Sequence, residues 1–279
     1  NPKSEKIASN LSDYIKALDE AGITQEVIIG SVDYILTQTN ANEILRTISK
    51  PATSKSITDL IKGLIEAGVL QSDIIIIINQ VVIKENPERI SNKLTELAAE
   101  LKQNGLSPAD ITARLNQTLE ETRPGRVADL ETDYIHALRD LGVSGAIIAA
   151  NITYILAQVK PEEIFKRLLN RGVAAAIGTM ITDLVAAGLS ETNVIAIVNI
   201  VTINAEPKQL AQSISELAKS LKGVEGAEAA TINRIITTVL SNPKSEKIAS
   251  NLSDYIKALD NAGITQEVII ASVDYILTQ

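Results

Sequence analysis

Apolar residues recur along this chain at intervals of three and four, the spacing of one face of an α-helix. The first stripe consists of Ile7, Leu11, Tyr14, Ile15 and Leu18. A second stripe of the same kind occupies residues 27–36. Strand-like alternation does not persist for more than a few residues, so the pattern predicts helices throughout.

Glycines divide this pattern into helical hairpins. Each glycine is expected to end one helix, and a Ser, Thr or Asp after it caps the next helix. These glycines are Gly22, Gly68, Gly105, Gly142, Gly188 and Gly263, with the Gly223/Gly226 region supplying the remaining turn. The clearest predicted caps are Thr24, Ser107 and Ser190. Seven of the eight prolines lie at the joints between hairpins, and Pro108 lies at a helix start, where proline is well tolerated.

The hairpins repeat at two longer periods. Residues 1–38 return as residues 242–279, and only Glu20/Asn261 and Gly30/Ala271 differ. A fainter match at an offset of 120 relates Asp13 to Asp133 and Asn86 to Glu206. These two periods predict a 241-residue unit that consists of two diverged half-units, 1–124 and 125–241. The first hairpin of a next unit, 242–279, follows it.

Three hairpin types follow from this alignment. First-type hairpins cover about 1–40, 125–160 and 242–279, second-type hairpins cover about 41–85 and 161–205, and third-type hairpins cover 86–124 and 206–241. Each second-type hairpin is preceded by a short extra helix, "ANEILRTIS" or "PEEIFKRLLNRG". The isoleucine run at 74–78 and the apolar run at 194–201 are predicted as buried helices, because their caps and the repeat alignment outweigh their β-branched composition.

Tandem helical hairpins of 35 to 45 residues are typical of an α-solenoid. In period and hairpin layout the chain resembles HEAT-like and other helical-repeat proteins, in the generic sense. The tetratricopeptide and ankyrin patterns are absent. We therefore expect an all-α, elongated and superhelical α-solenoid of about seven hairpins.

Composition narrows the partners and the chemistry. The chain has a net charge of −8, which disfavours nucleic acid and anionic membranes as partners. It has no cysteine, which excludes disulfides and thiolate metal sites. Its longest apolar run, residues 73–83, is about half of the roughly 20 residues that a membrane-spanning helix needs. No membrane insertion is therefore expected.

No catalytic, cofactor or metal site is predicted. His136 is the only histidine, and its counterparts Lys16 and Lys257 indicate a solvated surface position. The acids that precede tyrosines recur with the hairpin, so they do not define a unique carboxylate pair. No phosphate-binding glycine loop follows a strand. We therefore expect no cofactor and no enzyme activity.

The tyrosines are the candidate positions for packing or recognition. All six lie in first-type hairpins, one on each helix: Tyr14, Tyr34, Tyr134, Tyr154, Tyr255 and Tyr275. One interpretation is packing within or between hairpins, with the hydroxyls reaching a polar rim. The other is a regularly spaced recognition feature.

The near-identical ends indicate a recent duplication, and the chain is expected to be a window on a longer array. The leading hypothesis is a non-catalytic structural or adhesive segment: a rod, a spacer or a fibre-forming array. Its partners would be neighbouring copies of the repeat, within one chain or end to end. The alternative is an α-solenoid scaffold that binds a protein or peptide on its concave surface. The compartment is open, with an extracellular or cell-surface location favoured over the cytoplasm.

Overall fold

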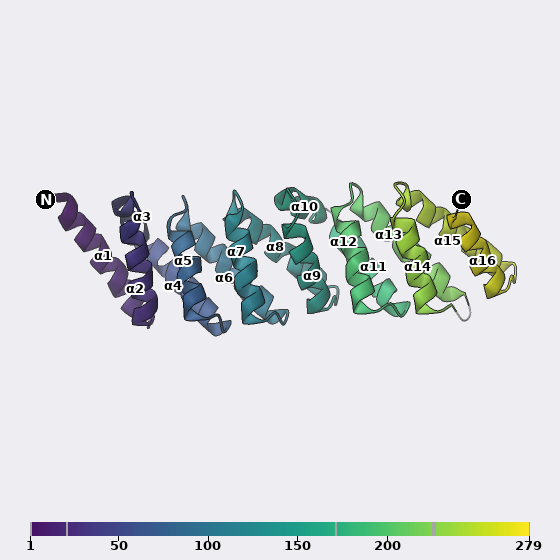
Figure 1. Cartoon of the computed structure of the whole chain (residues 1–279), viewed down its shortest axis with the longest axis horizontal. Coiled ribbons are helices and arrows are strands. Elements are labelled where there is room, and N and C mark those ends of the chain that lie inside the picture. Colours follow the sequence, from purple (N-terminus) through teal and green to yellow (C-terminus); the bar gives the residue numbers. More distant parts are fainter. Residues whose placement is uncertain (1, 21, 171, 225–226, 279) are drawn as a thin grey trace. The chain divides into compact units, whose positions relative to one another are not determined.

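The computed structural model describes residues 2–20, 22–170, 172–224 and 227–278, and these residues form sixteen α-helices without a strand (Figure 1). The first-type hairpins are α1 (Pro2–Glu20) with α2 (Gln25–Thr37), α8 (Pro124–Arg139) with α9 (Gly145–Leu156), and α15 (Ser245–Asn261) with α16 (Gln266–Leu277). The all-helical prediction is therefore confirmed.

The second-type segments carry the expected extra helix. They comprise α3 (Ala41–Ile48), α4 (Pro51–Glu66) and α5 (Gln71–Val82), and then α10 (Pro161–Leu168), α11 (Val173–Ala186) and α12 (Glu191–Ile203). The third-type hairpins are α6 (Pro87–Gln103) with α7 (Pro108–Glu120), and α13 (Pro207–Gly223) with α14 (Ala229–Leu240).

The chain divides into two compact units, Asn1–Thr132 and Asp133–Gln279, with the boundary inside α8. In unit 1, α4 packs on α1 and α6, while α5 packs on α2 and α7. In unit 2, α13 packs on α11 and α15, while α12 packs on α9 and α14, and α14 packs on α16. Each unit therefore consists of two rows of helices, and successive hairpins contact one another along both rows. The division into half-units at 124/125 and 241/242 stays a prediction.

The glycine turns explain where the helices end. Gly22, Gly68, Gly105, Gly142, Gly188 and Gly263 all have φ between 71° and 85°, a backbone conformation that glycine adopts without strain. Helix α13 ends at Gly223, in the region where the remaining turn was predicted, but Gly223 lacks the positive φ of the other six glycines and Val224 is the cap; Gly226 lies outside the described residues. Gly172 was not predicted as a turn residue, yet it has φ 81° and precedes α11.

The predicted caps hold in part. The Ser107 and Ser190 side chains accept hydrogen bonds from the backbone N–H of Asp110 and Asn193. Thr24 occupies the cap position of α2 but makes no capping hydrogen bond. The first turn of α2 therefore depends more on packing than on its cap.

The isoleucine run is helical, but α5 is not fully buried as the sequence suggested. Ile74, Ile77 and Ile78 are buried, whereas Ile76 is 48% exposed. A helix in a two-row stack has a solvent side, so five consecutive isoleucines cannot all lie in the core.

Candidate interaction surfaces

The first copy of the repeated sequence buries one face of its hairpin. Tyr14, Leu18, Val27 and Ile35 are fully buried in α1 and α2. These two helices pack on α3, α4 and α5. The Tyr14 hydroxyl and the Ser31 hydroxyl share a buried hydrogen bond of 3.1 Å, and burial raises the pKa of Tyr14 to about 12.

A close contact between α2 and α5 involves Gly30. A methyl group added to Gly30 would lie 3.0 Å from the side chain of Ile75. The helices therefore approach closely because no side chain separates them at this point.

The second copy exposes the face that the first copy buries. Val268, the counterpart of Val27, is 55% exposed, and Tyr255, the counterpart of Tyr14, is 36% exposed. Ile264 and Ile276 are exposed too, whereas their counterparts Ile23 and Ile35 are buried. The two copies differ in sequence at only two positions, so the difference in exposure follows from the helices that pack on each copy: α3, α4 and α5 on the first, and α13 and α14 on the second.

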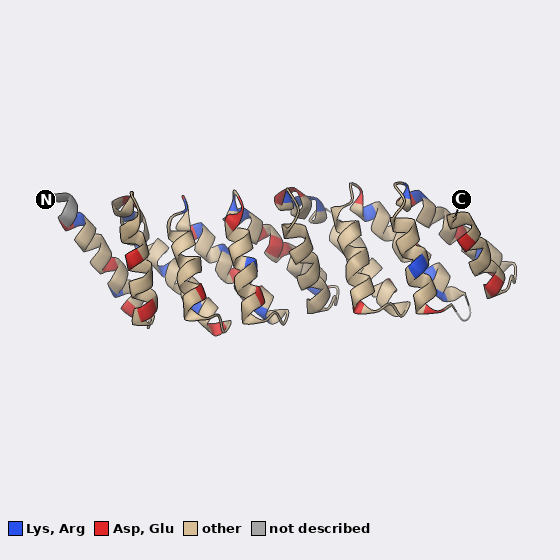
Figure 2. Ribbon diagram, in the orientation of Figure 1, with Lys and Arg blue, Asp and Glu red and all other residues tan. Residues whose placement is uncertain are grey.

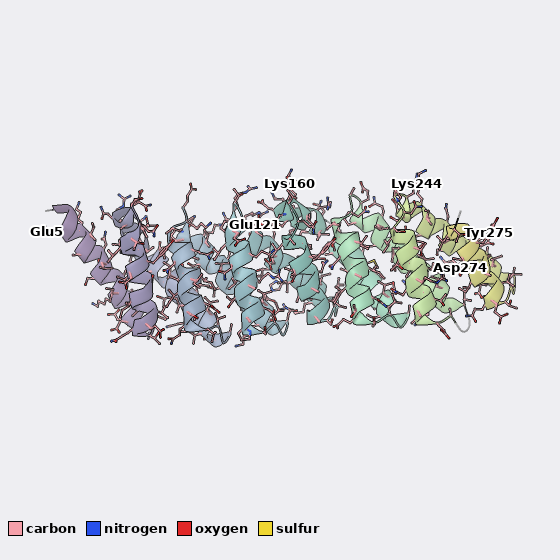
Figure 3. All side chains as sticks on the ribbon, in the orientation of Figure 1. Glu5, Glu121, Lys160, Lys244, Asp274 and Tyr275 are labelled. Carbon is pink, nitrogen blue, oxygen red and sulfur yellow. The ribbon has the colours of Figure 1, made fainter. Side chains whose placement is uncertain are left out.

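The opposite face of the second copy is the buried one. Here α15 and α16 pack on α13 and α14, and they bury Leu252, Ile256 and Val273. The Ser253 and Ser220 hydroxyls share a hydrogen bond of 2.8 Å. Arg234 binds the Asp274 carboxylate at 2.8 Å; Asp274 and the exposed Tyr275 are labelled on α16 in Figure 3.

In the first copy that opposite face is an open apolar groove. A pocket of about 400 Å³ lies there, lined by Ile15, Ile28, Ile29 and Val32, with Asp33 among its polar residues. Asp33 is the counterpart of Asp274. The same 38-residue sequence therefore has two faces, and each is covered in one copy and open in the other.

The middle first-type hairpin has a larger polar network. Tyr134 donates to Asn151 at 3.0 Å, and Asn151 donates in turn to Asn199 at 2.9 Å and Thr202 at 3.0 Å. The Tyr134 ring also contacts Phe165, with 5.9 Å between ring centroids. Burial raises the pKa of Tyr134. This network ties α8 and α9 to α12.

The six candidate tyrosines occupy three kinds of environment. Tyr14 and Tyr134 are buried, Tyr34 and Tyr154 are partly buried, and Tyr255 and Tyr275 are exposed. The hydroxyls of Tyr14 and Tyr134 bond inside their own hairpins rather than at a polar rim. Recognition by the tyrosines stays a prediction.

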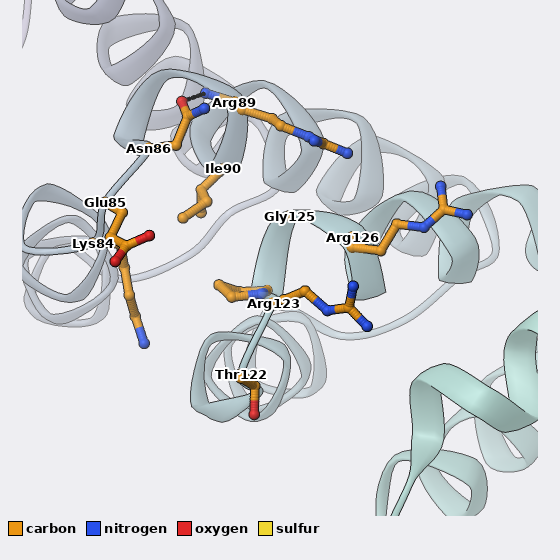
Figure 4. Close-up of a pocket in the computed structure, with 10 residues that line it drawn as sticks. Lys84, Glu85, Asn86, Arg89, Ile90, Thr122, Arg123, Gly125 and Arg126 are labelled. Carbon is orange, nitrogen blue, oxygen red and sulfur yellow. Dashed lines mark hydrogen bonds between the residues drawn. The ribbon is translucent and has the colours of Figure 1, made fainter.

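A basic pocket of about 330 Å³ lies where α6 and α8 begin (Figure 4). Its lining includes Lys84, Arg89, Arg123 and Arg126, with Glu85 as its one acid. In Figure 4 the three arginine side chains extend toward the same side, across from Lys84 and Glu85. Lys84 donates to the carbonyl of Leu119 at 2.9 Å, and Arg126 donates to Asp129 at 3.2 Å.

This pocket is a local exception to the charge pattern. Figure 2 shows acidic and basic residues interspersed along the helices of each unit. The counterparts of Lys84 and Arg89 at the 120-residue offset are Asn204 and Gln209. The basic character at these two positions is therefore specific to the first half-unit.

A buried ion pair was not predicted from the sequence. Glu131 is fully buried, with its carboxylate 3.9 Å from Arg114 Nε and 3.2 Å from the Thr118 hydroxyl. Burial outweighs the attraction of Arg114 and raises the pKa of Glu131 to about 7, and it lowers the pKa of Arg114. One signal was available: both other first-type hairpins have leucine at this position, Leu11 and Leu252.

Groups suited to metal binding do not gather in the part of the chain that is described. No cluster of three or more His, Asp or Glu residues there could hold a metal ion. His136 is partly buried on α8, rather than fully solvated as its lysine counterparts suggested. The expectation of no enzyme activity stays a prediction.

No single helix among the described residues is both long and apolar enough to cross a membrane. Helices α10 and α11 pass that test only when taken together, by length and composition alone. The combined length of α10 and α11 is weak evidence for a membrane span, because these helices bury apolar side chains inside unit 2: Phe165, Ile177, Met180 and Leu184.

The sequence matches no protein-family model, and no curated protein matches it.

Proposed function

We propose that this chain is a non-catalytic structural or adhesive repeat segment, in which first-type hairpins join neighbouring repeats of an α-solenoid. One observation supports this most strongly: Val27 and Val268 hold the same position in the repeated sequence, yet Val27 is fully buried and Val268 is 55% exposed. A hairpin with two apolar faces suits a connector within a series of repeats. Such a series would form a rod, a spacer or a fibre of 241-residue units.

The structure offers a direct test of this connector role. The sequence of residues 39–84 is appended after Gln279, so that α15–α16 is followed by the same helices that follow α1–α2. The appended helices should cover the open face, because they meet the sequence that they already pack on in unit 1. Labelling of Val268→Cys with a thiol reagent should then slow by about 100-fold or more, as a local opening free energy of roughly 3 kcal/mol implies.

The chain suits this measurement because it contains no natural cysteine. The control appends residues 39–84 in scrambled order. A Val268→Cys thiol that reacts equally fast with the native and the scrambled extension would refute the connector role.

The second candidate function is a scaffold that binds a protein or peptide, and the basic pocket favours an acidic peptide as its ligand. The positive side chains lie beside the N-termini of α6 and α8, where backbone N–H groups add positive potential. Ligand-facing positions in helical-repeat binding proteins differ between repeats. Lys84/Asn204 and Arg89/Gln209 fit that pattern.

Arg89→Gln, which installs the residue of the second half-unit, tests this candidate. Binding of a fluorescent hexaglutamate peptide, measured by anisotropy at low salt, should weaken about 5- to 10-fold, as the loss of one charge-assisted contact implies. Lys62→Gln on the exposed side of α4 is the control, since it removes the same charge away from the pocket. Equal affinities for both variants would exclude the pocket as the binding site.

A further inference from the structure

The open face of α15–α16 has a partner surface that unit 1 itself displays. Tyr255, Ile264, Val268 and Ile276 form this face, and all four are exposed. Their counterparts in α1–α2 are buried, in a hairpin that packs on α3, α4 and α5. The molecule therefore contains, at residues 41–82, a surface already shaped to the sequence of its last two helices.

We propose that α15–α16 of one molecule binds α3–α5 of a second copy, in the place that α1–α2 of that copy otherwise holds. This exchange rests on the proposed function, because it uses the same two-faced hairpin. Its contacts differ from those within one chain at only two of 38 positions, Glu20/Asn261 and Gly30/Ala271. Since the two partners contribute different surfaces, each joined molecule retains a free end, and the assembly grows head to tail.

The two differences affect the exchange unequally. Glu20 pairs with Lys16 at the surface, where both side chains are about 70% exposed, so its loss in Asn261 has little effect. Gly30 contacts Ile75, and the methyl group of Ala271 would lie about 3.0 Å from that side chain unless Ile75 shifts. The chain's own hairpin therefore fits its site better than the hairpin of a second copy.

The covalent connection also favours the internal hairpin. Helix α2 ends at Thr37 and α3 begins at Ala41, so α1–α2 stays at high effective concentration beside α3–α5. The α15–α16 hairpin of a second copy must compete with this tethered hairpin, and its binding also costs the translational freedom of one molecule. Exchange in the unaltered chain is therefore rare, and it becomes dominant once α1–α2 is released.

Val27→Asp tests the exchange by releasing α1–α2. Val27 is fully buried, and an unpaired carboxylate is not tolerated in an apolar contact. In sedimentation velocity at rising protein concentration, the Val27→Asp chain should reach a weight-average mass about twofold or more above the monomer. The unaltered chain should sediment mainly as a monomer.

The matched control places the same substitution in the same local sequence at the other end. Val268→Asp should remain monomeric, because Val268 is exposed and α1–α2 stays bound. The double variant Val27→Asp/Val268→Asp should also be monomeric, because neither hairpin can then bind α3–α5. A Val27→Asp chain that retains its helical circular dichroism and stays monomeric would contradict the exchange, as would a double variant that assembles equally well.

A second experiment keeps the fold of the unaltered chain and so does not depend on Val27→Asp folding. One chain carries Ala271→Cys and a second carries Ile75→Cys, and the two are mixed under slow oxidation. Exchange places these side chains against each other, as Gly30 lies against Ile75, so a disulfide-linked heterodimer should accumulate. Pairing Ala271→Cys with the exposed Ile76→Cys should give much less product, and equal yields would overturn the proposal.

The two proposals fail in distinguishable ways. If the appended residues protect Val268→Cys but neither Val27→Asp nor the cysteine pair links two copies, only the exchange is wrong. If the appended residues give no protection, the connector role and the exchange are both wrong.

Discussion

Tyr14→Ala is expected to destabilise the docking of α1–α2 by about 3–5 kcal/mol, the usual cost of removing a large buried aromatic side chain. Tyr14 is fully buried and its hydroxyl bonds to Ser31, so the substitution leaves a cavity and a buried hydroxyl without its partner. Hydrogen exchange measures this locally: amides of α2 should exchange about 100-fold faster or more, up to the point at which the hairpin is fully released.

Tyr255→Ala is the matched control at the identical local sequence. Because Tyr255 is already 36% exposed, its removal should cost about 1–2 kcal/mol in α16. The peptides that report on the two hairpins can be told apart by mass, since one contains Gly30 and the other Ala271. Equal acceleration in both hairpins would contradict the difference in burial.

The second large effect is a pH dependence that originates at Glu131. Its carboxyl has a pKa of about 7 in the folded chain against 4.5 for an ordinary glutamate, because burial disfavours the charged form. The folded state therefore binds this proton more tightly than the unfolded state does. The resulting stabilisation is complete below about pH 4.5 and is lost as the pH rises through 7, with a total of about 3 kcal/mol.

Glu131→Gln isolates this contribution, because glutamine is neutral at every pH. The free energy of unfolding is measured by urea titration at several pH values between 4.5 and 8. The difference between the unaltered chain and Glu131→Gln should shift by about 3 kcal/mol across that range, in the direction that disfavours the unaltered chain at high pH. A constant difference would show that Glu131 titrates normally.

Helix positions were largely predictable because the chain marks them locally. In each of six hairpins, a glycine with positive φ follows the first helix and ends it. Prolines occupy the first turn of α4, α6 and α7. These signals act within a few residues and need no knowledge of distant contacts. Gly223 also ends its helix but without a positive φ, and nothing nearby in the sequence distinguishes the two kinds of helix end.

The surfaces were not predictable, because burial depends on neighbours that local sequence does not encode. Tyr14 and Tyr255 have the same flanking residues, yet Tyr14 is fully buried and Tyr255 is 36% exposed. Glu131 lies inside although carboxylates normally lie outside, and only the comparison with Leu11 and Leu252 marks its position as part of the apolar stripe. The pocket around Arg89 combines residues from the starts of two helices that are far apart in the sequence.

The repeated 38-residue sequence presents opposite faces at its two occurrences. Thiol labelling of Val27→Cys and Val268→Cys in the otherwise unaltered chain measures this most directly, since cysteine is a small apolar residue and the background is free of thiols. We predict that the Val268→Cys thiol reacts nearly as fast as a free thiol. The Val27→Cys thiol should react at least about 100-fold more slowly. Equal rates at the two positions would show that the two copies do not differ in which face is covered.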